Sequence, residues 1–272
     1  MIQRAIAILL LIGVALLGYG YAEAVRTPVV RTLAVRWPGW TGPPITLLLM
    51  ADIHVAEPDM PPARLARIVA QANALAPDCV LIAGDMVSDK MVATRHVPTA
   101  EAVAPLAGLR PRLTTIAVPG NHDHWRGGAD MATALRGVGV TVLANAAARC
   151  GPIAVAGVDD DFTGRADVPK TIAAARALGG PRLMLSHSPD VFPAARGVPL
   201  VLAGHTHCGQ IAPPLIGPLS TMSRYGRRYA CGVVSESGRQ LVVTSGIGTS
   251  LLPLRIGAPP EMWLIRIGAP AP

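Results

Sequence analysis

Five short apolar runs in this 272-residue chain each end in polar side chains, and this pattern constrains the fold more than any other feature. Runs such as Ile45–Met50 and Cys79–Ala83 are typical of buried strands, and helix-like segments lie between several of them. In open α/β sheets, ligands bind outside the carboxyl ends of the strands. The sequence therefore predicts an α/β fold in which five strand ends converge on one cleft. The polar clusters after the runs are Asp52-Ile53-His54, Gly84-Asp85, Gly120-Asn121-His122-Asp123, Ser186-His187 and Gly204-His205-Thr206-His207.

The side chains in the first clusters are types that bind divalent metal ions. Asp52 and His54 are two residues apart, so in extended backbone both point the same way and can bind one ion. Asp85 is the expected bridging ligand, because one carboxylate can contact two cations. Asn121 and His187 are the expected ligands of a second ion. This mixture of nitrogen and oxygen ligands suits manganese, iron or zinc better than calcium or a purely magnesium site.

The remaining histidines complete the predicted site. His205 and His207 flank one residue, so we expect each to reach one ion. His122 is then free to protonate the leaving oxygen or to hold the phosphate, and Asp123 is expected to accept its imidazole N–H and set the tautomer. Two ions about 3.5–4 Å apart can activate a water and clamp a phosphoryl group in line. The sequence therefore predicts a phosphoester hydrolase in which a metal-bound hydroxide attacks phosphorus.

The N-terminal end carries an uncharged apolar segment, residues 5–22, which is near the minimum length for one membrane-spanning helix. We expect an uncleaved anchor over residues 1–22, a juxtamembrane linker over 23–44, and a catalytic domain over 45–268. A cleaved signal peptide is the alternative, because Ala22-Glu23-Ala24 has the small-x-small pattern of a cleavage site.

The side of the membrane is predicted only by charge. Arg26, Arg31 and Arg36 follow the apolar segment, whereas Arg4 precedes it. Under the positive-inside rule this distribution slightly favours a cytoplasmic catalytic domain. The signal-peptide alternative would place the domain outside the cytoplasm.

The formal net charge of +7 suits anionic partners such as phosphorylated substrates or a membrane surface. No dense basic block with interleaved aromatic residues is present, so we expect no nucleic-acid binding. The densest basic cluster is Arg224, Arg227 and Arg228, which we expect to bind a second phosphate or a lipid headgroup, with a solvated loop as the alternative.

The four cysteines are widely spaced and form no CxxC motif. Cys79 lies in an apolar run and is expected to be a buried thiol. A disulfide framework is not expected in a domain of this size, so the cysteines do not predict a compartment.

In their order, the five clusters resemble those of the calcineurin-like metallophosphoesterase superfamily, from about residue 45 to residue 209. The resemblance implies a four-layer α/β/β/α sandwich, here preceded by one N-terminal transmembrane helix. It also implies His122 as general acid with Asp123 behind it. The implied ligands of the first ion are Asp52, His54, Asp85 and His207, and those of the second are Asp85, Asn121, His187 and His205.

A narrower resemblance covers the segments 204–210, 244–250, 253–255 and 260–261. They are similar to the membrane-associated bacterial branch, which includes phosphodiesterases and UDP-2,3-diacylglucosamine pyrophosphatases of lipid A synthesis. The branch commonly has glycine where this chain has Cys208, beside His207, and serine where it has Ala51.

The resemblance implies hydrolysis of a phosphodiester or pyrophosphate bond in a phosphorylated lipid or nucleotide-lipid, such as UDP-2,3-diacylglucosamine, at the bacterial inner membrane. The expected cofactors are two divalent ions, manganese first, with iron, zinc or magnesium as alternatives. A general envelope phosphodiesterase or phosphomonoesterase of unknown substrate and a non-catalytic metal-binding scaffold are the other functions considered.

Overall fold

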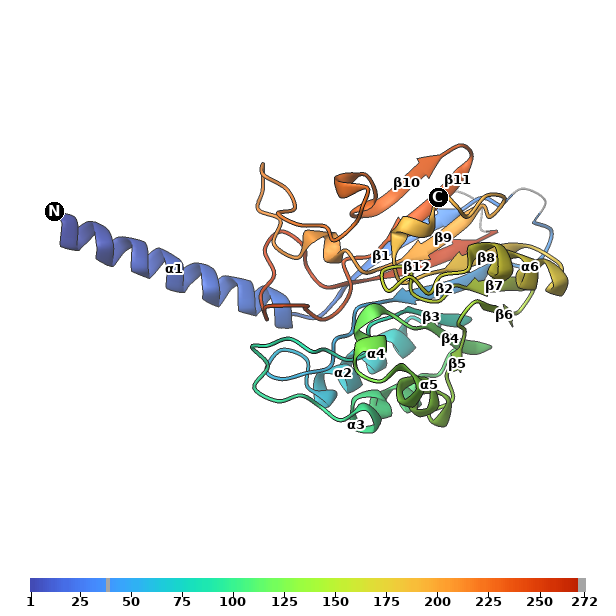
Figure 1. Ribbon diagram of the computed structural model, residues 1–272, viewed down its shortest axis with the longest axis horizontal. Coiled ribbons are helices and arrows are strands. Elements are labelled where there is room, and N and C mark those ends of the chain that lie inside the picture. The colour runs from blue at the N-terminus through green and yellow to red at the C-terminus, as the bar shows by residue number, and fades with distance from the viewer. Residues whose placement is uncertain (38–39, 269–272) are drawn as a thin grey trace.

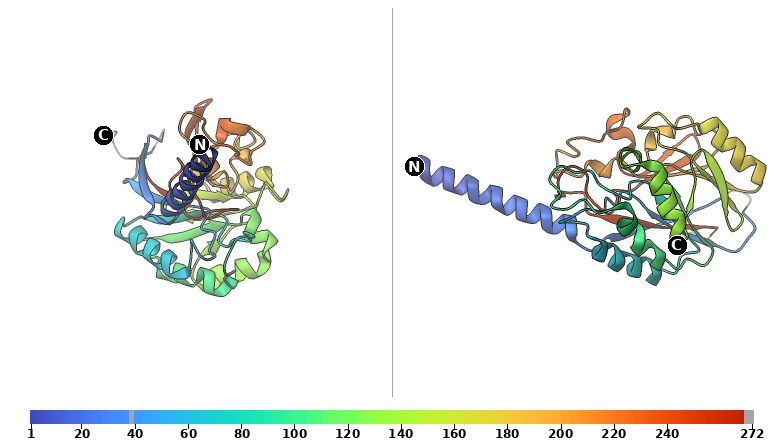
Figure 2. Two further views of the ribbon diagram at one scale, coloured as in Figure 1. Left: turned by 90° about the vertical axis from the view of Figure 1, so that its left-hand side faces the viewer. Right: turned by 60° about the horizontal axis from the view of Figure 1, so that its bottom comes forward.

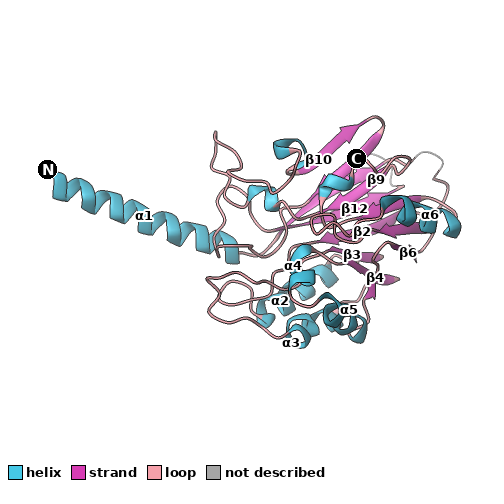
Figure 3. Ribbon diagram, viewed as in Figure 1, coloured by secondary structure: helices cyan, strands magenta, loops and turns pink. Residues whose placement is uncertain are grey.

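The computed structural model describes residues 1–37 and 40–268. A long helix, α1 (Ile2–Val25), projects away from a domain in which two six-stranded sheets stack between outer helices (Figure 1; Figure 3). The arrangement confirms the predicted four-layer α/β/β/α sandwich. The outer helices are α2 (Pro62–Ala74), α3 (Thr99–Val103), α4 (Asn121–Trp125), α5 (Gly128–Gly137) and α6 (Val168–Leu178).

Both sheets are mixed. The first has the order β1-β12-β2-β3-β4-β5 and is parallel except between β12 and β2. The second has the order β10-β11-β9-β8-β7-β6 and is antiparallel only at its two edges. The strands of the first sheet are β1 (Val29–Val35), β2 (Ile45–Met50), β3 (Cys79–Ala83), β4 (Thr114–Val118), β5 (Thr141–Val142) and β12 (Glu261–Ile267). Those of the second are β6 (Ala146–Cys150), β7 (Ile153–Gly157), β8 (Arg182–Leu185), β9 (Leu200–Ala203), β10 (Gly232–Glu236) and β11 (Arg239–Val243).

Alternation along each strand divides the apolar side chains between three cores. On β2, Leu47 and Leu49 pack between the sheets, whereas Leu48 and Met50 pack under α2. The second sheet repeats this pattern, with its outer face covered by α6. Strands buried on both faces explain why the sequence shows continuous apolar runs.

The five polar clusters follow strands that are parallel neighbours. Strands β2, β3 and β4 lie side by side in one sheet, and β8 and β9 do so in the other. The carboxyl ends of parallel neighbours lie at one edge of a sheet. Both sheets therefore deliver their polar clusters to the same edge of the sandwich.

The predicted linker over residues 23–44 is wrong in most of its length. Helix α1 continues to Val25, and β1 pairs with β12 from Val29 to Val35. The ladder of backbone hydrogen bonds makes this segment an edge strand of the domain. Residues 38 and 39, also in the predicted linker, lie outside the described residues.

The four cysteines form two disulfides, Cys79–Cys150 and Cys208–Cys231, so the expectations of a buried Cys79 thiol and of no disulfides are wrong. The first bond joins β3 of one sheet to β6 of the other. The partners are 71 and 23 residues apart in sequence, a spacing that no local motif reveals.

Candidate metal centre

A first group of buried donors lies between the ends of β2, β3 and β9. The Nε2 atoms of His54 and His207 are 3.1 Å apart. His54 Nε2 lies 3.5 Å from Asp85 Oδ2, and His207 Nε2 lies 3.7 Å from Asp52 Oδ1. These four side chains are the set expected around the first ion.

A second group shares Asp85 with the first. His187 Nε2 is 3.2 Å from Asp85 Oδ2 and 3.0 Å from Asn121 Oδ1. His205 Nδ1 lies 3.1 Å from the same His187 nitrogen. The structure thus brings all seven sequence-predicted ligands together, with Asp85 placed between the two groups.

Backbone geometry positions these donors. Five of the donor residues have a positive φ, between 50° and 69°, a backbone region that residues other than glycine rarely adopt. They are Asp52, His54, Asp85, His205 and His207. Backbone strain of this kind is concentrated at functional sites. Neighbouring glycines allow the close approach, because a Cβ at Gly120 would collide with Asp85 and one at Gly204 would collide with Asp52.

Hydrogen bonds from outside the two groups orient the donors. His187 Nδ1 donates to the carbonyl of Ala83 at 2.8 Å, which leaves its Nε2 lone pair facing the second group. His205 Nε2 donates to the Met222 carbonyl at 3.3 Å, which leaves Nδ1 facing inward. Asp85 Oδ1 accepts the backbone N–H of His122 at 2.9 Å, so Oδ2 faces both groups.

Burial dominates the electrostatics of the imidazoles. It lowers the pKa of His205 to about 4, and it holds the pKa values of His54 and His207 well below the ordinary value. These rings are therefore neutral near pH 7, the form in which an imidazole binds a metal. For His187, burial opposes the charged form, but the negative charge of Asp85 and a hydrogen bond to it raise the pKa well above the ordinary value.

Burial and neighbouring charges also shift the pKa values of the buried carboxylates, in opposite directions for different residues. Burial raises the pKa of Asp52 to about 7 and that of Asp123 to about 6, and the charge of Asp85 adds to both shifts. For Asp85, burial alone would raise the pKa, but the charge of His187 and its hydrogen bond lower it overall. The buried carboxylates have too little positive charge around them to stabilise all of their ionised forms. Bound cations would supply that charge.

The donor set fits metal ions. Ligand atoms that share one ion at about 2.0–2.2 Å are spaced as closely as the nitrogen and oxygen atoms here. Among the described residues, the buried His54 Nδ1 has no hydrogen-bond partner, so hydrogen bonding at that atom does not explain the orientation of the ring. Three sets of buried side chains each have ligand atoms within 4.8 Å of one another, namely Asp52, His54 and His207; Asp52, Asp85 and His187; and His54, Asp85 and His122.

His122 lies beside the two groups, with Nε2 4.0 Å from Asp85 Oδ2 and its ring edge-on to that of His54. Its Nδ1 pairs with Asp89, a residue that the sequence analysis did not single out. The prediction that Asp123 holds the imidazole is wrong. The Asp123 carboxylate instead accepts the backbone N–H groups of Gly120 at 3.0 Å and Met86 at 2.8 Å.

The helix explains this difference. Adjacent residues on a helix do not face the same direction. Asp123, in the first turn of α4, points back toward the free N–H groups at the helix start, while His122 points into the cleft. Asp89 follows Asp85 on the loop after β3. This short spacing is the one sequence signal that could have indicated Asp89 as a residue of the site.

A cleft of 460 Å³ opens over the second group. His122, His205 and His207 line its floor, and one wall is aromatic. The rings of Trp125 and Phe162 meet edge-on at 6.2 Å, and Phe162 also contacts His205. Neither aromatic residue belongs to a sequence cluster, so only the fold reveals this wall.

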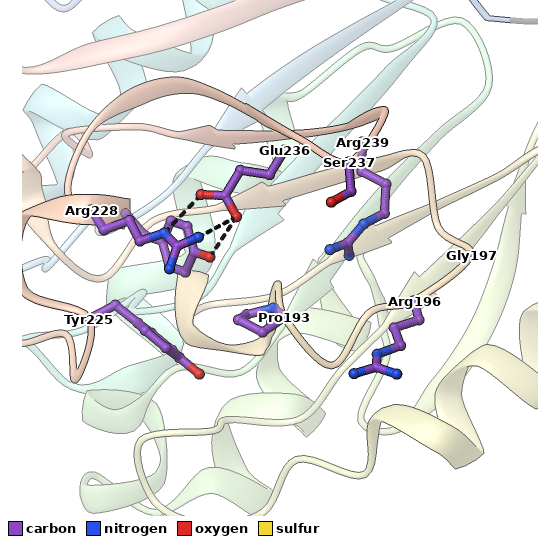
Figure 4. A pocket seen from close by; sticks show the side chains of 9 residues that line it. Pro193, Arg196, Gly197, Tyr225, Arg228, Glu236, Ser237 and Arg239 are labelled. Atoms are coloured by element: carbon purple, nitrogen blue, oxygen red, sulfur yellow. Dashed lines mark hydrogen bonds and ion pairs between the residues drawn. The ribbon is translucent and has the colours of Figure 1, made fainter.

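The structure does not place the predicted substrate-binding arginines in the lining of this cleft. Arg224 pairs with Asp161, and Arg227 donates to the Pro218 carbonyl at 3.2 Å. Arg228 pairs with Glu236 at 2.9 Å beside a separate surface pocket (Figure 4). The prediction that all three bind substrate is therefore not supported, because carboxylates already neutralise Arg224 and Arg228.

Four layers with a buried Asp, Asn and His cluster at the strand ends are the architecture of a metal-dependent hydrolase. Comparison with known proteins identifies the family. The family model for calcineurin-like phosphoesterases matches residues 45–209. The chain therefore belongs to the calcineurin-like phosphoesterase family, a family of hydrolases of phosphoric esters that depends on two metal ions.

Curated relatives agree with this family. The chain is 30% identical to phosphodiesterase YaeI of Escherichia coli over 234 residues, 82% of each protein. It is 29% identical to an uncharacterized metallophosphoesterase of Helicobacter pylori over 93% of this chain and 68% of that protein. It is 30% identical to a zebrafish transmembrane protein with a metallophosphoesterase domain, over 95% of this chain and 62% of that protein.

Helix α1 is long and apolar enough to cross a membrane, by length and composition. The expected N-terminal helix is thus present, and both the anchor and the signal-sequence interpretations fit it. The predicted phosphoester hydrolase is confirmed at the level of the family.

Proposed function

We propose that this protein hydrolyses a phosphodiester or pyrophosphate bond in a lipid-linked substrate. The observation that carries the proposal is that donors of both groups line a cleft with an apolar wall; these donors are Asp85, Asn121, His205 and His207. The donor groups suit the phosphate, and the apolar wall suits a hydrophobic part of the same molecule.

We assign the first ion to Asp52, His54, Asp85 and His207, and the second to Asp85, Asn121, His187 and His205. Two such ions, manganese in the first instance, supply an activated water and stabilise charge on the phosphoryl group. The chain's own part is to hold the donors in place.

His122 is the proposed general acid. Its Nε2 faces Asp85 and the cleft, and the Asp89 carboxylate on Nδ1 fixes the ring in that orientation. Nε2 is therefore placed to pass a proton to the leaving oxygen.

The first test compares two substrates with detergent-purified full-length protein and Mn²⁺. UDP-2,3-diacylglucosamine represents the nucleotide-lipid class, and bis-p-nitrophenyl phosphate represents soluble diesters. We expect hydrolysis that EDTA and His122→Ala abolish, while His96→Gln retains activity because His96 lies outside both donor groups. Full metal occupancy with no turnover of either substrate would instead support the non-catalytic scaffold.

The disulfides favour a second candidate, a general envelope phosphodiesterase or phosphomonoesterase of unknown substrate. Such bonds persist in oxidising compartments and are rare in the cytosol. We therefore propose that the domain faces the outside of the inner membrane, opposite to the side slightly favoured by the charges.

Protease treatment of spheroplasts tests the orientation. We expect the domain to be digested in intact spheroplasts under conditions that spare a cytoplasmic marker. Protection until the membrane is lysed would return the domain to the cytoplasmic face and restore UDP-2,3-diacylglucosamine as the leading substrate.

A further inference from the structure

Three loops around the mouth of the cleft expose large apolar side chains. They comprise residues 89–93 after β3, 211–222 after β9 and 250–254 before β12. Folded proteins rarely gather so many exposed apolar side chains around one opening unless that surface meets a partner or a membrane. We call this surface the apolar rim; each of its large side chains is at least 45% exposed. They include Met91, Leu215, Ile216, Leu219, Leu251 and Leu252.

Helix α1 ends against this same surface. The backbone N–H of Arg255 donates to the Gly20 carbonyl at 2.9 Å, and Gly20 packs on the Leu254 side chain. The loop that carries Leu251 and Leu252 therefore contacts the last turns of the helix. In two views α1 leaves the domain on the side where the three loops project (Figure 1; Figure 2).

The length of α1 leaves no spacer between the domain and a bilayer. The uncharged residues 5–22 span about 27 Å at about 1.5 Å per residue, against a hydrocarbon core about 30 Å thick. The whole uncharged segment is thus needed to cross the bilayer. Gly20 and Ala24 are already buried against the domain. The surface beside them must then lie at the depth of the lipid headgroups.

A basic side chain lies at the edge of the apolar rim. Arg227 is exposed, and its guanidinium donates to the carbonyl of Pro218, next to Leu219. An arginine beside exposed leucine and isoleucine side chains is the pattern of surfaces that bind at the membrane interface. Apolar side chains enter the acyl boundary, and the cation contacts anionic headgroups.

We propose that the apolar rim inserts into the surface of the bilayer that α1 spans, with Arg227 among the headgroups. The cleft then opens at the lipid surface. The consequence for substrate selection rests on the proposed function. An amphiphile would present its phosphoester to the donor groups while its acyl chains remain in or near the membrane.

The test measures depth and needs no catalysis. Environment-sensitive fluorophores are attached to Leu215→Cys and Leu251→Cys in the full-length protein, in nanodiscs of phosphatidylcholine and phosphatidylglycerol that contain doxyl-labelled lipid. Leu113→Cys is the matched control. Leu113 is also an exposed leucine, but it precedes β4 and so lies at the opposite edge of the sheet from the cleft.

We expect doxyl lipid to quench both rim fluorophores several-fold more than the Leu113 fluorophore, and aqueous iodide to show the reverse order. Equal quenching at all three positions would overturn the proposal. Folding of each variant is checked by its circular dichroism spectrum, so this comparison does not depend on activity.

A second variant tests whether the apolar rim contributes to activity on a membrane substrate. Leu215→Ser with Ile216→Ser changes the apolar rim outside the cleft lining. We expect unchanged turnover of the soluble diester and a several-fold loss with a phosphodiester lipid in vesicles. Equal turnover by this variant and the unmodified protein in vesicles would contradict docking. If the unmodified protein cleaves neither substrate, the proposed function fails while the quenching result still decides docking.

Discussion

At the scale of single residues, the site depends on pairings that adjacent sequence positions do not predict. His122 and Asp123 are neighbours in the chain, yet one faces the cleft and the other holds backbone N–H groups. Asp89, on a different loop, supplies the carboxylate at His122. The orientation of His122, the proposed general acid, therefore depends both on α4, which carries it, and on the loop after β3, which carries Asp89.

Substitution of Asp89 should separate orientation from metal binding. We expect Asp89→Asn to lower kcat on a soluble diester, because the amide holds the His122 ring less firmly than the carboxylate does. The loss should be smaller than for His122→Ala, since removing a general acid costs about 10²–10⁴-fold. Metal content measured by mass spectrometry should be unchanged in both variants. Loss of metal from Asp89→Asn would show that Asp89 supports the metal centre instead.

Lys90 illustrates a second pairing. Its ammonium is fully buried, contacts Asp59 at 2.7 Å and Thr249 at 2.8 Å, and so ties the loop after β3 to the loop before β12. Lys90→Met leaves the Asp59 carboxylate buried without its cation, which costs about 3–5 kcal/mol. Urea unfolding should show this loss, whereas Lys170→Met, at the exposed other lysine, should have little effect. Equal stability of both variants would mean that water replaces the ammonium.

At the scale of elements, the parallel strands assemble the centre, and the sheets must hold their relative position. The disulfide Cys79–Cys150 ties β3 to β6, and the inter-sheet core packs around it. Because each donor group combines residues that follow strands of both sheets, such as Asp85 after β3 and His187 after β8, movement between the sheets would pull apart the donors within each group.

Removal of this disulfide should destabilise the domain. We expect the pair Cys79→Ala with Cys150→Ala to lower the free energy of unfolding by about 2–5 kcal/mol, because the closed loop restricts the unfolded chain. The disulfide Cys208–Cys231 closes a shorter loop, so the pair Cys208→Ala with Cys231→Ala should lower the free energy of unfolding by less. Denaturant unfolding with and without dithiothreitol measures both effects. A reductant-insensitive unmodified protein would contradict the structural role.

The strands and helices that the sequence predicted are those with strong local signals. Runs such as β2 and β3 are apolar on both faces, so their strand ends and the convergence of the polar clusters could be predicted. Strand β1 was missed because six of its seven residues are exposed or only partly buried, and because its partner β12 lies at the far end of the chain. The disulfides and the Asp89–His122 pair depend on contacts between distant segments, which no single motif contains.

At the scale of the whole molecule, helix α1, the apolar rim and the cleft lie on one side. Helix α1 meets the loop before β12, and that loop contributes Leu251 and Leu252 to the cleft lining. The proposed membrane attachment and access to the candidate metal centre are therefore linked by geometry. The chain spans 62% of its zebrafish relative, so activities of that whole protein are not transferred to this one.

The most direct test of the central claim is the metal content of the purified protein and of Asp85→Ala. Asp85 is the side chain shared by both donor groups, whereas the other six belong to one group each. We predict two manganese ions per chain after reconstitution in the unmodified protein, and loss of most metal together with diester hydrolysis in Asp85→Ala. His96→Gln should keep both ions. Two tightly held ions in Asp85→Ala would contradict a bridged centre at the convergence of the five strand ends.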